Sequence, residues 1–183
     1  MSTAPLKSIL IGLFLFVIHI EGTCQKSDRE IGVSVYGLGS DFNLIYKKKL
    51  ANDLYRRINI GLANLSFSTN DNQSASNFLV AFGTGRERRK PISKKLEFIH
   101  GFQYSISFGF NHTKNETNYL IIPGLAYLAG IKYDLNENLY LTLETFPDIS
   151  ASIGLGDTRY FIIKAGLDIN AIDVGIVYRF HKD

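Results

Sequence analysis

The feature that most constrains the fold is a strict alternation of side-chain character within residues 96–110. Every second residue from 98 to 110 is apolar or aromatic, apart from His100. The residues between them, from 101 onward, are glycine, serine or glutamine. Successive side chains of a β-strand point to opposite faces, so this period of two separates the two sets. The segment is therefore expected to be a strand with one large apolar face and one small polar face.

The same alternation recurs along the chain between turn signals rich in Gly, Asn, Ser and Asp. We expect eight strands, at 30–38, 42–50, 54–67, 77–87, 96–110, 118–134, 138–154 and 161–180. In the third strand the apolar phase changes near Ala63 and Asn64, which predicts a β-bulge. The sequence contains no linker or low-complexity tract. Residues 25–183 are therefore expected to form one domain.

The composition of the two faces indicates where each one points. A soluble barrel shows water a face rich in Lys, Glu and Asp, but here the polar face is mostly Gly, Ser, Gln, Asn, Thr and Ala. Such small groups fit the narrow interior of an eight-stranded barrel. The other face carries Phe, Tyr, Ile and Leu, which suit lipid. We expect an all-β, eight-stranded antiparallel up-and-down transmembrane β-barrel.

A secreted lipocalin-like barrel that binds lipid in an apolar cavity is the alternative fold with the same strand count. Such a barrel usually has disulfides and a tryptophan near its first strand, whereas this chain has one cysteine and no tryptophan. Alternation alone is a weak signal for each strand, so this alternative stays open here.

Residues 1–24 have the three-part plan of a secretory signal peptide. A short segment with one lysine precedes an apolar run at 9–20, and the chain turns polar at Gln25. A membrane-spanning helix needs about 20 apolar residues, which this run does not reach. We expect cleavage after Cys24 and export from the cytoplasm.

Cys24 is the only cysteine, so no disulfide can hold the exported chain together. The alternative role for Cys24 is lipid attachment, but Glu21 stands three residues earlier, where lipoprotein signals prefer an aliphatic side chain. The formal net charge of +3 is too small to predict nucleic-acid binding.

The C-terminal strand carries the most specific pattern. Its apolar or aromatic set is Ile172, Val174, Ile176, Tyr178 and Phe180. A terminal aromatic with this alternation resembles the signal that the outer-membrane barrel assembly machinery reads. Together with the strand count, the pattern resembles the small outer-membrane β-barrels of Gram-negative bacteria, the OmpA/OmpX-like family, called porin-like in Bacteroidota. The resemblance covers residues 25–180 and implies an integral outer-membrane protein. His181 to Asp183 depart from it, because the family usually ends on the aromatic.

The order of the strands predicts the topology. With eight antiparallel strands, the connections at 39–41, 68–76, 111–117 and 156–160 share one side, and those at 51–53, 88–95 and 135–137 share the other. Outer-membrane barrels have short periplasmic turns and longer outer loops. We therefore expect the first set to be extracellular. Residues 161–171 are either part of a long last strand or part of an outer loop.

Charged residues at inward positions are the candidate site. The expected lumen network is Lys47, Lys49, Arg57, Lys132, Asp134, Glu144, Asp173 and Arg179. Buried charges must be paired. The network is either a polar gate on a narrow ion path or a structural plug, and eight strands leave little room for water.

Basic residues also gather near the expected periplasmic turns. They are Lys47, Lys48, Lys49, Arg56, Arg57, Arg86, Arg88, Arg89, Lys90, Lys94 and Lys95. Either they attract anionic lipid headgroups or an acidic periplasmic partner, or they only keep the turns solvated.

No constellation of catalytic residues stands out. His100 is expected to face lipid, on the opposite face from Ser105 and Ser107, and His112 is expected in a loop. No carboxylate pair or metal-ligand spacing is found, so we expect no enzyme activity, no cofactor and no metal.

Two hypotheses about function remain. The first is a structural or surface-interaction barrel with a filled lumen, whose outer loops 68–76 and 111–117 contact surface ligands. The second is minor porin-like transport of small solutes or ions. The expected partners are outer-membrane lipid and the barrel assembly machinery, with no nucleic acid, and the expected state is a monomer.

Overall fold

The computed structural model describes residues 29–36, 41–70, 73–113, 116–157, 159–166 and 172–180. The expected signal peptide, residues 37–40 and residues 181–183 lie outside this description. The strands are β1 (Arg29–Tyr36), β2 (Asp41–Lys49), β3 (Leu54–Asn70), β4 (Gln73–Pro91), β5 (Leu96–His112), β6 (Thr117–Asp134), β7 (Leu139–Thr145), β8 (Asp148–Gly156), β9 (Tyr160–Gly166) and β10 (Ile172–Phe180). Within the described ranges, no helix is long and apolar enough to cross a membrane.

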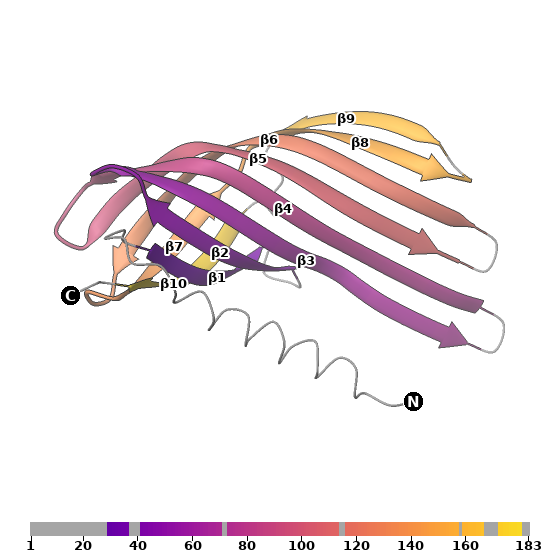
Figure 1. Ribbon diagram of the computed structural model, residues 1–183, viewed down its shortest axis with the longest axis horizontal. Helices are drawn as coiled ribbons and strands as arrows, with labels where there is room; N and C mark the ends of the chain where they lie inside the picture. Colours follow the sequence, from indigo (N-terminus) through magenta and orange to yellow (C-terminus); the bar gives the residue numbers. More distant parts are fainter. Residues whose placement is uncertain are drawn as a thin grey trace.

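The strands close into an antiparallel barrel (Figure 1). Each of β1 to β5 pairs with the next, β6 pairs with β7, β7 with β10, and β10 returns to β1. Closure leaves no free edge in this part of the sheet, as a lipid environment requires. The predicted eight-stranded up-and-down barrel is confirmed.

Two of the eight expected strands are each divided in two. β7 and β8 both pair with β6, at successive stretches of it, so β8 continues β7 beyond Phe146 and Pro147. Proline has no N–H to donate and interrupts the ladder, although its carbonyl accepts a hydrogen bond from the Tyr127 amide at 2.9 Å. β9 pairs with β8, and β10 pairs with β7. Residues 160–166 are therefore strand, and 167–171 lie outside the described residues.

Several expected connections are wrong in length. The segment 68–76 is mostly paired strand, because Asn70 lies opposite Gln73. Likewise β5 and β6 extend to His112 and from Thr117, which shortens the loop expected at 111–117. The turn expected at 88–95 is confined to 92–95, since β4 pairs with β5 as far as Pro91. Asn, Ser and Thr side chains do not prevent strand pairing, so polar composition alone did not locate the ends of these turns.

The β-bulge in the third strand is confirmed, because the register between β3 and β4 shifts between Ala63 and Ser66. A bulge adds local twist and bend to the strand that carries it. It lies where β3 begins to extend beyond the end of its pairing with β2 at Leu62.

The two ends of the barrel differ. We call the end with the turns 50–53, 92–95 and 135–138 the short-turn end (Figure 1). Phe180 lies there too, because it pairs with Arg29 and Arg29 pairs with Lys48. At the opposite end, β3 to β6 and the β8–β9 hairpin reach beyond β1 and β2 (Figure 1). We call this the long-hairpin end.

The interior of the barrel holds most of the buried charged and polar side chains together with a few apolar ones, and the outside is apolar. Along β10 the residues Asp173, Gly175 and Val177 are buried, while the residues between them are exposed. Along β5, Phe102 and Tyr104 are exposed and Ile99 is fully buried. The alternative of a lipocalin-like barrel with an aromatic-lined cavity is therefore wrong, because the aromatic face lies on the outside.

Candidate functional site

Long charged side chains cross the lumen at the short-turn end. Lys47 Nζ lies 2.7 Å from Glu87 Oε2 and 3.5 Å from Glu144 Oε1. Arg57 Nη1 lies 2.5 Å from Glu144 Oε2 and 3.6 Å from Glu87 Oε2. All four side chains are at most 1% exposed. They come from β2, β3, β4 and β7, and the Arg57–Glu144 pair joins two strands on opposite sides of the barrel.

Glu30 of β1 is the centre of a second group of contacts. Arg89 donates two hydrogen bonds to its carboxylate, at 2.9 and 2.5 Å, and the Tyr140 hydroxyl donates a third at 2.5 Å. Arg179 Nε donates a fourth at 3.2 Å. Arg89 also donates to Glu87 at 2.6 Å, which connects both groups into one network. Bidentate arginine–carboxylate pairs of this kind are strong and geometrically specific.

The network reaches the rim of the short-turn end through Arg179 and Asp134, and Lys132 joins it there. Lys132 Nζ lies 2.8 Å from Glu97 and 3.0 Å from Asp134, whose side chains are partly exposed. Arg179 Nη2 lies 3.4 Å from the same Asp134. These outer pairs are screened by water and contribute less than the buried ones.

Aromatic rings occupy the space between the charges. Tyr140 is fully buried, and its ring centroid lies 5.0 to 5.8 Å from the cationic groups of Lys47, Arg89, Lys132 and Arg179. The Arg89 guanidinium stacks 3.7 Å from the Tyr55 ring. Desolvated cation–π contacts are worth about 2 kcal/mol each. We call the buried charges and these two tyrosines the charged plug; its members are Glu30, Lys47, Tyr55, Arg57, Glu87, Arg89, Lys132, Tyr140, Glu144 and Arg179.

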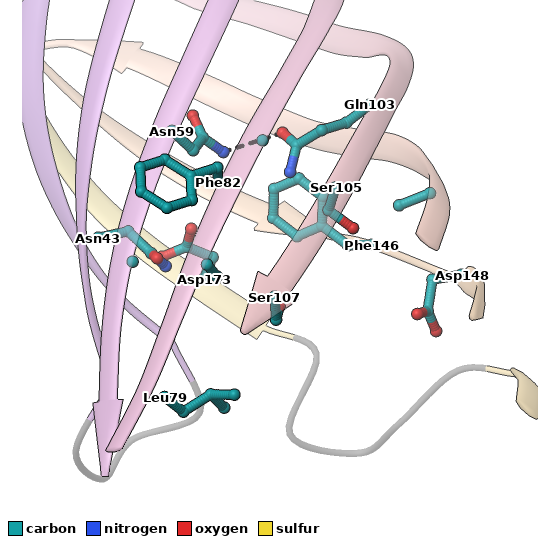
Figure 2. A pocket seen from close by; sticks show the side chains of 14 residues that line it. Asn43, Asn59, Leu79, Phe82, Gln103, Ser105, Ser107, Phe146, Asp148 and Asp173 are labelled. Carbon is teal, nitrogen blue, oxygen red and sulfur yellow. Dashed lines mark hydrogen bonds between the residues drawn. The ribbon is translucent and has the colours of Figure 1, made fainter. Parts of the chain in front are cut away.

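A cavity of about 270 Å³ lies in the lumen beyond the charged plug. Figure 2 shows the side chains that line it. Its polar lining residues are Asn43, Asn59, Gln103, Ser105, Ser107, Asp148 and Asp173. Asn59 donates a hydrogen bond to Gln103 at 2.9 Å and accepts one from Arg57 Nε at 3.0 Å. The cavity floor is thus bonded to the charged plug. Asp173 accepts a hydrogen bond from the Ser34 hydroxyl at 2.8 Å, and its Oδ1 has no hydrogen-bond partner within the described part of the chain.

Solved structures share this architecture. Neisserial surface protein A aligns with a TM-score of 0.55 at 14% identity, covering 84% of this chain and 94% of that chain. A major outer membrane protein from Thermus thermophilus aligns with a TM-score of 0.54 at 13% identity, covering 85% and 100%. The chain has the fold of the small outer-membrane β-barrels. No protein-family model matches the sequence, and no curated protein matches it either.

Most of the expected lumen residues meet in this barrel. Lys47, Arg57, Lys132, Asp134, Glu144 and Arg179 belong to the charged plug or its rim. Asp173 lies apart from them as a lining residue of the cavity. Lys49 is half-buried near the end of β2.

Among the members of the charged plug, sequence reasoning missed Glu30, Tyr55, Glu87, Arg89 and Tyr140. The alternation of inward and outward residues along each strand identifies three of them as inward-facing. Glu30 shares its face with Gly32 and Ser34, Glu87 shares its face with Gly83 and Gly85, and Tyr140 shares its face with Thr142 and Glu144. Arg89 was assigned to a turn that proves to be strand.

The described residues bring together no metal-binding group of histidines, cysteines and carboxylates. His100 lies on the outer face of β5, whereas Ser105 and Ser107 line the cavity. His112 is at the long-hairpin end, 2.9 Å from the Thr117 hydroxyl. This geometry pairs no serine with a histidine base within the described strands.

Proposed function

We propose that the protein is an integral outer-membrane β-barrel with a structural or surface-interaction role and a lumen closed by side chains. The single observation that carries this proposal is the charged plug, whose ion pairs link non-adjacent strands across the lumen. The exposed apolar face of β5, β6, β7 and β10 supports insertion in lipid.

The plug supports a closed lumen for an energetic reason. Removing one partner of a buried ion pair costs about 3–5 kcal/mol, because the other charge stays buried without compensation. A conducting path would have to separate several such pairs at once. Eight strands leave an interior that side chains can fill, and an aqueous channel needs about 16 strands.

Planar-bilayer recording tests this proposal against the transport hypothesis. The folded protein should insert without steady single-channel current. The double variant Lys47→Ala with Arg57→Ala removes two cations of the charged plug. It should show more current than the unaltered protein if the plug blocks the lumen. Steady conductance of the unaltered protein would favour the transport hypothesis.

The proposal includes an orientation. Residues 1–24 would be removed as a signal peptide, the short-turn end would face the periplasm, and the long-hairpin end would face outward. The β3–β4, β5–β6 and β8–β9 hairpins would then offer the surface for ligands. Single cysteines in turn 92–95 and near Thr113 would test it, because only the second should react with an impermeant label on intact cells.

Assembly would depend on β10. Its outward residues, Ile172 to Phe180 at every second position, are exposed, and β10 closes the barrel by pairing with β1. We propose that the assembly machinery recognises this strand and that the barrel works as a monomer. Phe180→Asp should lower membrane levels far more than deletion of residues 181–183. Equal losses would place the signal elsewhere.

A further inference from the structure

A row of basic side chains lies on the outward face of the barrel near the short-turn end. Lys48, Arg56 and Arg86 are direct neighbours across β2, β3 and β4, since Lys48 pairs in register with Arg56 and Arg56 with Arg86. Arg88 follows on the same face of β4, opposite Leu54. We call Lys48, Arg56, Arg86 and Arg88 the basic row. Its three arginines are exposed.

The described part of the chain provides no carboxylate within ion-pair distance of the basic row. The acidic residues of the neighbouring strands, Glu30, Glu87 and Glu97, point inward and bind inward-facing cations. Like charges directly opposite each other on adjacent strands destabilise a sheet. Three such neighbours in register therefore favour an anion supplied from outside the chain.

A groove of about 610 Å³ lies beside two members of the row. Its side-chain walls are Leu54, Arg86, Arg88, His100, Phe102 and Tyr104. Gly85 and Gly101 also line it, and a Cβ at either would meet backbone of the neighbouring strand. Phe102 is 58% exposed and Tyr104 is 64% exposed. The groove thus combines guanidinium groups with exposed aromatic rings, as the boundary between headgroups and acyl chains favours.

His100 adds an unpartnered polar atom to this groove. It lies opposite Arg88 in the β4–β5 register, and its Nε2 is buried with no hydrogen-bond partner within the described residues. A guanidinium presents donors in a planar fork that matches two oxygens of a phosphate. Arg86 and Arg88 therefore offer donors from one strand to one phosphate group, beside the His100 ring of the adjacent strand.

We propose that the basic row and its groove bind the phosphodiester headgroup of an anionic phospholipid. Arg86 and Arg88 would hold the phosphate, and Phe102 and Tyr104 would pack against the glycerol and upper acyl chain. The proposal rests on the proposed function, in which the short-turn end lies in the periplasmic, phospholipid leaflet. It identifies charge complementarity, rather than solvation of the turns, as the role of these arginines.

Spin-labelled lipids test the site in the folded barrel. In phosphatidylcholine vesicles, electron paramagnetic resonance measures how strongly labelled phosphatidylglycerol associates relative to labelled phosphatidylcholine. The unaltered protein should prefer phosphatidylglycerol. The double variant Arg86→Gln with Arg88→Gln should lower that preference by about fivefold for each arginine, as one basic group near a membrane surface contributes.

The matched control is Lys94→Gln with Lys95→Gln, which removes the same charge from the exposed turn 92–95. It should change the preference much less, and this result supports the site. Equal loss in both double variants, or an unchanged preference in the arginine variant, would overturn it. Heat-dependent migration on gels checks that every variant is a folded barrel. If the unaltered protein gave no such barrel in lipid, the proposed function would fail, and the lipid site with it.

Discussion

At the short-turn end of the lumen, long charged side chains and two tyrosines fill the barrel, whereas beyond them small amides and hydroxyls leave a cavity of about 270 Å³. The same wall encloses both halves, and polar side chains face into both. They differ in how their polar groups are satisfied. In the charged plug, Glu30 accepts hydrogen bonds from side chains of three other strands, β4, β7 and β10. In the cavity, water can replace a lost partner.

This difference teaches where the barrel should tolerate change. A buried charge cannot be left alone, so the charged plug should respond strongly to loss of any central member. A neutral amide at a cavity wall loses about one hydrogen bond and regains part of it from water. The four predictions below test this contrast, from the largest expected effect to the smallest.

Glu30→Ala should have the largest effect. It leaves Arg89, Arg179 and the Tyr140 hydroxyl without their shared acceptor. The free energy of unfolding in lipid vesicles should fall by about 3–5 kcal/mol. Urea titration followed by far-UV circular dichroism measures it. The control is Glu97→Ala at the partly exposed rim, which should cost about 1 kcal/mol or less. Similar costs at both positions would remove the distinction between plug and rim.

Ile106→Arg tests the outer wall that both halves share. Ile106 faces outward in the middle of β5. An arginine at the lipid-facing midplane costs about 2–4 kcal/mol, and near an interface about 0–1 kcal/mol. Phe98→Arg, on the same face close to the short-turn end, is the matched control and should cost less in the same titration. If Ile106→Arg left the free energy of unfolding unchanged, this face would not contact acyl chains.

Asn59→Ala should cost about 1 kcal/mol, because it removes the bonds to Arg57 and Gln103 at the cavity floor. The same unfolding measurement applies. Ser107→Ala, another cavity-lining change, is the control and should cost less. A loss as large as that of Glu30→Ala would show that the cavity half is as tightly coupled as the charged plug.

Ser105→Cys should leave the stability almost unchanged, since the two side chains are nearly the same size. Its thiol reactivity compares the cavity with the packed part of the lumen. The new thiol lines the cavity, so a small water-soluble thiol reagent should modify it in the folded barrel. Thr142→Cys, at a position only 3% exposed, should react far more slowly. Equal rates of thiol modification at positions 105 and 142 would contradict tight packing of the lumen outside the cavity.

The alternation of apolar and polar residues along the strands was sufficient to predict the barrel and several lumen residues. Inward positions followed from counting along each strand, which is why Lys47, Arg57 and Glu144 were expected inside. The division of the seventh expected strand into β7 and β8 was not expected, because the alternation continues across Phe146 and Pro147. The extent of β4 was underestimated, since a run of arginines and lysines has no apolar partner to show its period.

What the sequence determined by itself is the period of two, the inside-out distribution of apolar groups and the closing strand β10. These follow from local geometry, because neighbouring residues of a strand must face opposite sides. The tertiary structure alone decided which inward charges meet. Glu30 and Tyr140 are 110 residues apart yet share a hydrogen bond, and Arg56 and Arg86 become neighbours only through the β3–β4 register. Register and barrel closure are properties of strand pairs, and a pattern read along one strand at a time does not contain them.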